Sequence, residues 1–141
     1  MSRILKYLSV LALLCQVQAV FAQNPTTVQT TPKLVICYFH PNERCPIDQS
    51  IEEATRKLMR TDFAKEIKNG VIKLQVLNTD DKANAKTVAK FEMNAQALYL
   101  VTNVKGKEVK NDLTEFAFSN SLNNPAKFKA GLREEILRAI K

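Results

Sequence analysis

One run of seven residues restricts the fold of this chain more than any other feature. Residues Lys33 to Phe39 read K-L-V-I-C-Y-F, a nearly unbroken series of aliphatic, β-branched and aromatic side chains. A strand with one face in water alternates apolar and polar residues, whereas a continuous apolar run is typical of a strand buried on both faces. Such strands occur mainly in parallel sheets covered by helices. The sequence therefore predicts an α/β fold with this strand at its centre.

A helical pattern follows this strand after the loop from His40 to Arg44. From Pro46 to Met59 apolar side chains recur at spacings of four, three and four, which is one stripe of a helix. Pro46 suits the first helical turn, where its missing N–H costs nothing. A second apolar run, Val71 to Asn78, completes a β-α-β unit, whose strands are expected to be parallel.

The rest of the chain supplies two more strands and further helices. The expected elements are a short helix ending at Ile67, a helix from Asp80 to Met93, strands at Ala97–Asn103 and Glu108–Leu113, and a helix at Pro125–Ile140 capped by Asn123 or Asn124. The last two strands flank a turn at Lys105–Lys107 and should form an antiparallel hairpin. The predicted order is β-α-β-α-β-β-α, a four-stranded mixed sheet with flanking helices.

The first 22 residues have the pattern of a secretory signal peptide. Arg3 and Lys6 precede an apolar run from Leu8 to Cys15, and small residues surround a cleavage point after Ala22. The run is shorter than the ~20 residues of a membrane span, so we expect no stable membrane insertion after cleavage. Residues 23–32 are rich in Thr and Pro and should be a flexible leader to a domain at 33–141. The expected location is periplasmic or secreted.

Composition narrows the possible partners. The chain has 21 Lys+Arg against 14 Asp+Glu, but the two signs are interleaved and no basic run of five occurs. This pattern, together with export, argues against a nucleic-acid partner. Only three glycines are present, and no phosphate-binding loop is recognisable, so no cofactor is expected.

Three segments resemble a known family. They are Y-F-H-P-N-E-R-C-P-I-D at Tyr38–Asp48, L-Q-V-L-N-T-D-D at Leu74–Asp81, and K-F-E-M-N-A-Q-A-L-Y-L-V at Lys90–Val101. They are similar to thioredoxin-like proteins, in particular the small exported members of the ArsF-type nitroreductase subunit group. The resemblance implies a thioredoxin-like three-layer fold over residues 33–141, with a redox cysteine, Cys45, at the start of the first helix.

The chain departs from the thioredoxin pattern at two places. The C-x-x-C motif reads C-P-I-D, so Asp48 stands where the second thiol would be, and the stretch from Asn94 to Ala97 lacks the proline that thioredoxins carry in cis. In a two-thiol site the second thiol cleaves the mixed disulfide that the first thiol forms. Asp48 cannot do this, so turnover through Cys45 would need an outside thiol.

The residues around Cys45 act in opposing directions. A helix N-terminus and Arg44 favour the thiolate, whereas Asp48 disfavours a second negative charge and competes for the same N–H donors. From the sequence the net direction stays open, as does the alternative that Asp48 is only a helix cap and Cys45 has no chemical role. Pro46 would shape the site, and His40 and Gln96 would lie at its rim.

Cys37 offers a second thiol. The resemblance places it near the buried acid that serves the second cysteine of many thioredoxins, so thiol and acid could have exchanged places between Cys37 and Asp48. A disulfide from Cys37 to Cys45 requires Cα atoms within about 7 Å, which needs a loop that folds back. The alternative is a buried apolar cysteine in a strand.

The sequence leaves three candidate functions. The first is thiol-linked redox work or mixed-disulfide formation by a monothiol oxidoreductase, with a thiol substrate or a protein partner. The second is a non-catalytic binding or adaptor module, because a fold alone does not carry chemistry. The third is metal or metalloid binding, since Cys37, His40, Cys45 and Asp48 are ligand types that zinc or copper accepts.

Overall fold

The computed structural model describes residues 31–93 and 95–141, so the predicted signal peptide and most of the leader lie outside the described residues. The elements are β1 (Leu34–His40), α2 (Pro46–Thr61), α3 (Ala64–Lys68), β2 (Ile72–Asn78), the 3-10 helix η1 (Lys82–Asn84), α4 (Ala85–Phe91), β3 (Ala97–Val104), β4 (Lys107–Asp112), α5 (Thr114–Asn120) and α6 (Pro125–Ile140). No described helix has both the length and the apolar character that a membrane crossing requires.

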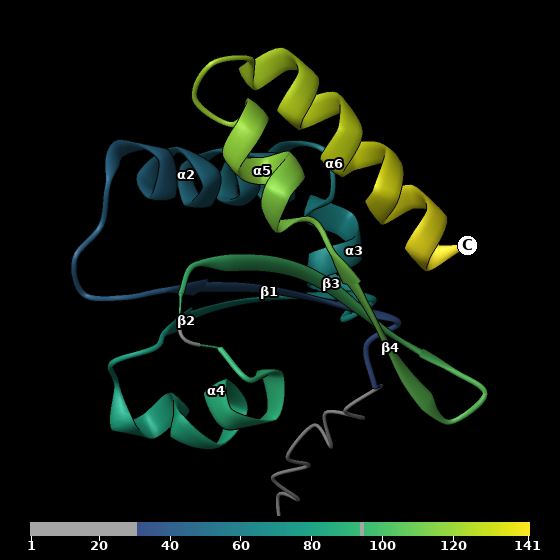
Figure 1. Cartoon of the computed structure of the whole chain (residues 1–141). Helices are drawn as coiled ribbons and strands as arrows, with labels where there is room; N and C mark the ends of the chain where they lie inside the picture. The colour runs from purple at the N-terminus through teal and green to yellow at the C-terminus, as the bar shows by residue number, and fades with distance from the viewer. Residues whose placement is uncertain (1–30, 94) are drawn as a thin grey trace, which may run out of the picture.

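The four strands form one mixed sheet in the order β2-β1-β3-β4. β1 is parallel to β2, while β3 is antiparallel to both β1 and β4. Helices α2, α5 and α6 cover one face of the sheet, and α4 lies on the other (Figure 1). The predicted α/β architecture with a parallel β-α-β unit is confirmed, and it is consistent with a thioredoxin-like α/β fold.

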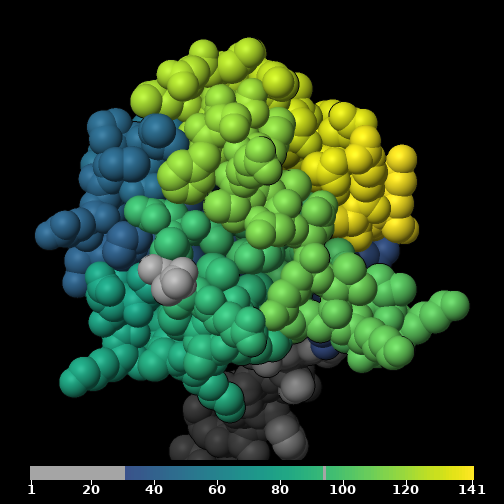
Figure 2. All heavy atoms as spheres, viewed as in Figure 1, coloured from purple at the N-terminus to yellow at the C-terminus, as the bar shows by residue number. Residues whose placement is uncertain are grey.

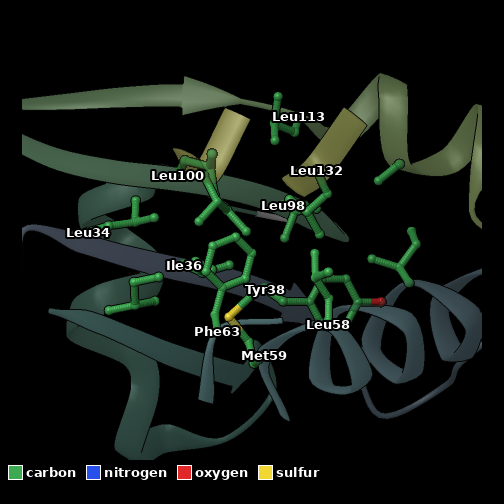
Figure 3. Packing of buried hydrophobic residues seen from close by; sticks show 14 of the residues in the cluster. Leu34, Ile36, Tyr38, Leu58, Met59, Phe63, Leu98, Leu100, Leu113 and Leu132 are labelled. Atoms are coloured by element: carbon green, nitrogen blue, oxygen red, sulfur yellow. The ribbon is translucent and has the colours of Figure 1, made fainter. Parts of the chain in front are cut away.

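β1 is buried on both faces, as its continuous apolar run predicts. Leu34, Ile36 and Tyr38 are fully buried in the larger core, between the sheet and helices α2 and α6. Figure 3 shows Ile36 and Tyr38 among side chains from these helices and from β3. The alternate residues Cys37 and Phe39 face a smaller cluster beneath α4. Neighbouring residues of one strand thus belong to different layers of the domain.

Two helical regions differ from the prediction. Helix α5 was not expected, and it forms where Phe116 stacks on Phe128 of α6 with ring centroids 5.9 Å apart. The helix expected from Asp80 to Met93 is shorter, because Asp81 caps a 3-10 turn by accepting a hydrogen bond from Ala83 N–H at 2.9 Å, and α4 starts only after that turn. The expected cap of the last helix is Asn124, whose side chain accepts from Lys127 N–H at 3.2 Å.

Candidate functional site

Cys45 is the N-cap residue of α2, a helix of 16 residues. A loop of five residues connects β1 to this helix. The backbone of Cys45 is extended, with φ −83° and ψ 166°, and Pro46 is the first helical residue, so helix α2 cannot extend further toward the N-terminus. Cys45 is exposed. The sequence-based placement of this thiol at a helix start is therefore confirmed.

Asp48 caps the first turn of α2 with its side chain. Its Oδ2 accepts a hydrogen bond from the Cys45 backbone N–H at 3.0 Å, in a capping box that also brings the Cys45 side chain to the Asp48 N–H. The same oxygen accepts from Gln96 Nε2 at 3.1 Å. Asp48 has no exposed surface, and its Oδ1 has no hydrogen-bond partner among residues 31–93 and 95–141. A buried carboxylate thus lies three residues after the exposed thiol of Cys45.

Tyr38 is a fully buried residue of β1 that contacts Asp48. Its hydroxyl donates a hydrogen bond to the Asp48 carbonyl at 2.8 Å. Burial raises the pKa of Tyr38 to about 12, and the nearby Asp48 charge adds to this rise while a hydrogen bond with Arg44 opposes it. The hydroxyl therefore remains protonated and continues to donate. The sequence predicted Tyr38 only as a core residue. Its contact with the site could have been anticipated, because Tyr38 lies two residues after Ile36 and so on the same face of β1, the face that α2 covers.

The guanidinium of Arg44 binds two partners other than the Cys45 thiol. Its Nη1 lies 2.7 Å from Glu52 Oε2, and its Nη2 donates to the Asp48 carbonyl at 3.3 Å. Burial alone would raise the pKa of Glu52, but hydrogen bonds from Arg56 and Arg44 outweigh it and hold that pKa below its usual value. The positive charge of Arg44 is therefore matched by an ionised partner. Glu52 was missed from the sequence, although it forms an i,i+4 pair with Arg56.

Cys37 lies in the other layer of the domain. It is 2% exposed, packs in the cluster beneath α4, and its Sγ lies 3.7 Å from Gln75 Oε1. Burial raises the pKa of the Cys37 thiol to about 11, an effect that Glu108 reinforces and several lysines oppose. Cys37 and Cys45 are both free thiols. The alternative of a Cys37–Cys45 disulfide is therefore wrong, and so is an exchange of places with Asp48, because Tyr38 is the β1 residue that contacts Asp48.

His40 ends β1 and turns toward the following residue. Its Nδ1 lies 2.9 Å from the Pro41 carbonyl, so Nδ1 carries the proton and donates. Within the described ranges no three His, Cys, Asp or Glu side chains come close enough to hold a metal ion. The four potential ligands seen in the sequence do not converge, because Cys37 points to the α4 layer while Asp48 is buried under α2.

Comparison with known proteins adds little to this geometry. No family model and no curated protein matches the chain. A solved chain described as "Structure of a malarial protein" is 18% identical, with a TM-score of 0.43, over 70% of this chain and 93% of that one.

The site combines one accessible thiol with a buried, hydrogen-bonded carboxylate. Cys45 lies at the start of α2, with its side chain beside the Asp48 backbone N–H. Asp48 is held by hydrogen bonds with the Cys45 backbone, with Gln96 just before β3 and with Tyr38 of β1. Such a site can form one bond to an incoming sulfur, and the described residues contain no second thiol in contact with Cys45.

Proposed function

We propose that this protein performs thiol–disulfide exchange through the single thiol of Cys45. The observation that carries the proposal is the contrast between its two described cysteines: Cys45 is exposed at a helix N-terminus, whereas Cys37 is buried with a pKa of about 11. The resemblance of Tyr38–Asp48 to exported thioredoxin-like proteins supports the same reaction, and the pattern of residues 1–22 supports a periplasmic or secreted location.

The reaction has two balanced steps. The Cys45 thiolate attacks one sulfur of a substrate disulfide; a new S–S bond forms to Cys45, and the other sulfur leaves as a thiolate that takes a proton from water. Release then needs a thiol from solution: after losing its proton to water, its sulfur attacks the substrate sulfur of the mixed disulfide, a new disulfide forms between these two sulfurs, and Cys45 leaves as the thiolate. Because Asp48 occupies the place of a resolving thiol, the mixed disulfide persists until such a thiol arrives.

Oxidised glutathione tests this proposal on the full chain carrying Cys15→Ser, so that the cysteine in the signal sequence does not react. We expect one glutathionyl adduct per chain by intact-mass spectrometry, and we expect added dithiothreitol to remove it. Cys45→Ser should abolish the adduct, whereas the matched variant Cys37→Ser should retain it. A Cys45 thiol that reacts with iodoacetamide no faster than free cysteine at neutral pH would remove the physical basis of the proposal.

A binding or adaptor module is the second candidate. The feature that favours it is the cap itself, since Asp48 accepts from both Cys45 N–H and Gln96 Nε2 and so has a complete structural role without any chemistry. In that case a protein partner would bind Cys45→Ser as tightly as the unchanged chain. Partner affinity that is lost in this variant and retained in Cys37→Ser would instead support the thiol reaction. The four dispersed ligand types no longer support metal binding as a candidate.

A further inference from the structure

Strand β4 forms an edge of the sheet that no strand within residues 31–93 and 95–141 covers. It is the last strand in the order β2-β1-β3-β4, and all six of its residues are exposed. Val109, in the middle of the strand, is 46% exposed. Figure 2 shows the hairpin of β3 and β4, in green, projecting from the body of the domain. An open edge presents unpaired N–H and C=O groups to another chain.

The hairpin determines which backbone groups of β4 point outward. A two-residue turn, with positive φ at Lys105 and Gly106, joins the strands and makes Val104 and Lys107 the closing hydrogen-bonded pair. Six residues after Lys107, the N–H of Leu113 donates a hydrogen bond to the Leu98 carbonyl at 2.8 Å. Hydrogen-bonded pairs therefore recur at every second residue from Lys107 to Leu113. Odd-numbered residues of β4 therefore bond to β3. The backbone groups of Glu108 and Lys110 face away from the sheet.

We propose that β4 pairs antiparallel with β4 of a second copy of this chain, with Val109 facing Val109 on the two-fold axis. In this register Glu108 of each copy faces Lys110 of the other, and these are the residues whose backbone groups point outward. Opposite charges directly across a strand pair are stabilising, and symmetry makes the contact twice. Lysines usually protect an edge strand, but here Lys110 of each copy meets Glu108 of the other.

Neighbouring registers lack this match. Placing Lys110 on the axis would oppose two lysines, and placing Glu108 there would oppose two glutamates, both of which are unfavourable. Placing Val109 on the axis also brings its exposed side chain against an identical one at a non-hydrogen-bonded pair, where side chains approach most closely. All three of these registers pair outward-facing residues with one another, so charge favours the register centred on Val109 over those centred on Glu108 and Lys110.

The charged side chains already lie on one face of the sheet. Glu108 forms an ion pair with Lys90 through Oε2, and Lys110 Nζ donates to the Lys90 carbonyl at 3.1 Å while lying 4.1 Å from the centroid of the Phe91 ring. A two-fold axis normal to the sheet keeps both residues on the α4 face in each copy. The paired edge is short, so the dimer should be weak and sensitive to salt.

Sedimentation equilibrium of the full chain at low salt tests the dimer. Lys110→Glu should raise the dissociation constant at least about tenfold, because Glu108 then meets a glutamate. The double swap Glu108→Lys with Lys110→Glu should restore dimerisation. Lys107→Glu makes the same charge change on the same strand but faces Asn111 of the second copy, so it should have a smaller effect than Lys110→Glu; circular dichroism checks that each variant folds.

Cross-linking tests the register independently. In a chain whose three native cysteines are serines, Val109→Cys should form a covalent dimer on oxidation, whereas Lys107→Cys, displaced from the axis, should not. The proposal is overturned by a monomer at about 1 mM protein, by a dimer that Lys110→Glu and Lys107→Glu weaken equally, or by cross-linking that is as efficient at position 107 as at 109.

Discussion

The buried carboxylate of Asp48 accepts a hydrogen bond from the backbone N–H of Cys45 at 3.0 Å. The side chain of Asp48 therefore holds the backbone of the residue that carries the exposed thiol. Gln96, the residue just before β3, donates to the same oxygen at 3.1 Å. Asp48 and Gln96, 48 positions apart in the sequence, are thus in direct contact.

Replacing Asp48 by cysteine should create a two-thiol site. Residues three apart in a helical turn are neighbours, and a disulfide spans Cα separations of about 4.4 to 6.8 Å. We expect Asp48→Cys to form a disulfide between Cys45 and the introduced thiol under mild oxidation, detected by loss of two thiols in a titration. The reduced form should be less stable by about 1 kcal/mol, because the cap on Cys45 N–H is lost. Cys45→Ser combined with Asp48→Cys is the control; a variant whose two thiols both stay free contradicts the expected geometry.

The Cys37 thiol should make stability depend on alkaline pH. Burial raises its pKa from 9.0 to about 11, so between these values the folded chain keeps a proton that the unfolded chain loses. The contribution of Cys37 to the free energy of unfolding is therefore complete below pH 9. It falls by about 2 kcal/mol as the pH rises toward 11. Urea unfolding across this range should show a shallower decline for Cys37→Ala than for the unchanged chain. The decline should persist in Cys45→Ser; equal declines in all three proteins would be inconsistent with a buried titrating thiol.

Tyr38→Phe should destabilise the site without opening a cavity. The variant removes only the hydroxyl that donates to the Asp48 carbonyl at 2.8 Å in a buried setting. A buried hydrogen bond of this kind contributes about 1 kcal/mol. The urea midpoint should fall accordingly with an unchanged slope, and an unaltered midpoint would show that the carbonyl is satisfied by Arg44 alone.

Gly131→Ala should reverse the usual effect of this substitution in a helix. Alanine normally stabilises a helix interior by roughly 1 kcal/mol over glycine, but a Cβ at position 131 would overlap the tip of the Phe116 ring. That ring stacks on Phe128, so we expect a net loss of about 1 kcal/mol from overpacking. In a Phe116→Leu background the same change should become stabilising. Thermal unfolding of the four proteins measures the coupling, and additive effects would rule out the clash.

Local sequence patterns predicted the elements whose burial follows from their own residues. The continuous apolar run of β1, the stripe of α2 and the Asn124 cap of α6 each specify an element without reference to distant segments. The start of α2 at Cys45 was predictable for the same reason, because a proline at the first helical position follows a local rule. Helix α5 was missed because a helix of seven residues is marginal without tertiary packing, which here includes the stacking of Phe116 on Phe128 of α6.

The arrangement of the site depended on contacts that the sequence pattern does not encode. A strand buried on both faces has no polar residue to mark its orientation, so the sequence determined that Cys37 is buried but not that it faces α4. Likewise it placed Asp48 in the first turn of α2, but the burial of that carboxylate rests on Gln96, 48 positions away, and on Tyr38 beneath it. Periodicity is a property of neighbouring residues, whereas a buried charge is stabilised by partners that only the folded chain brings together.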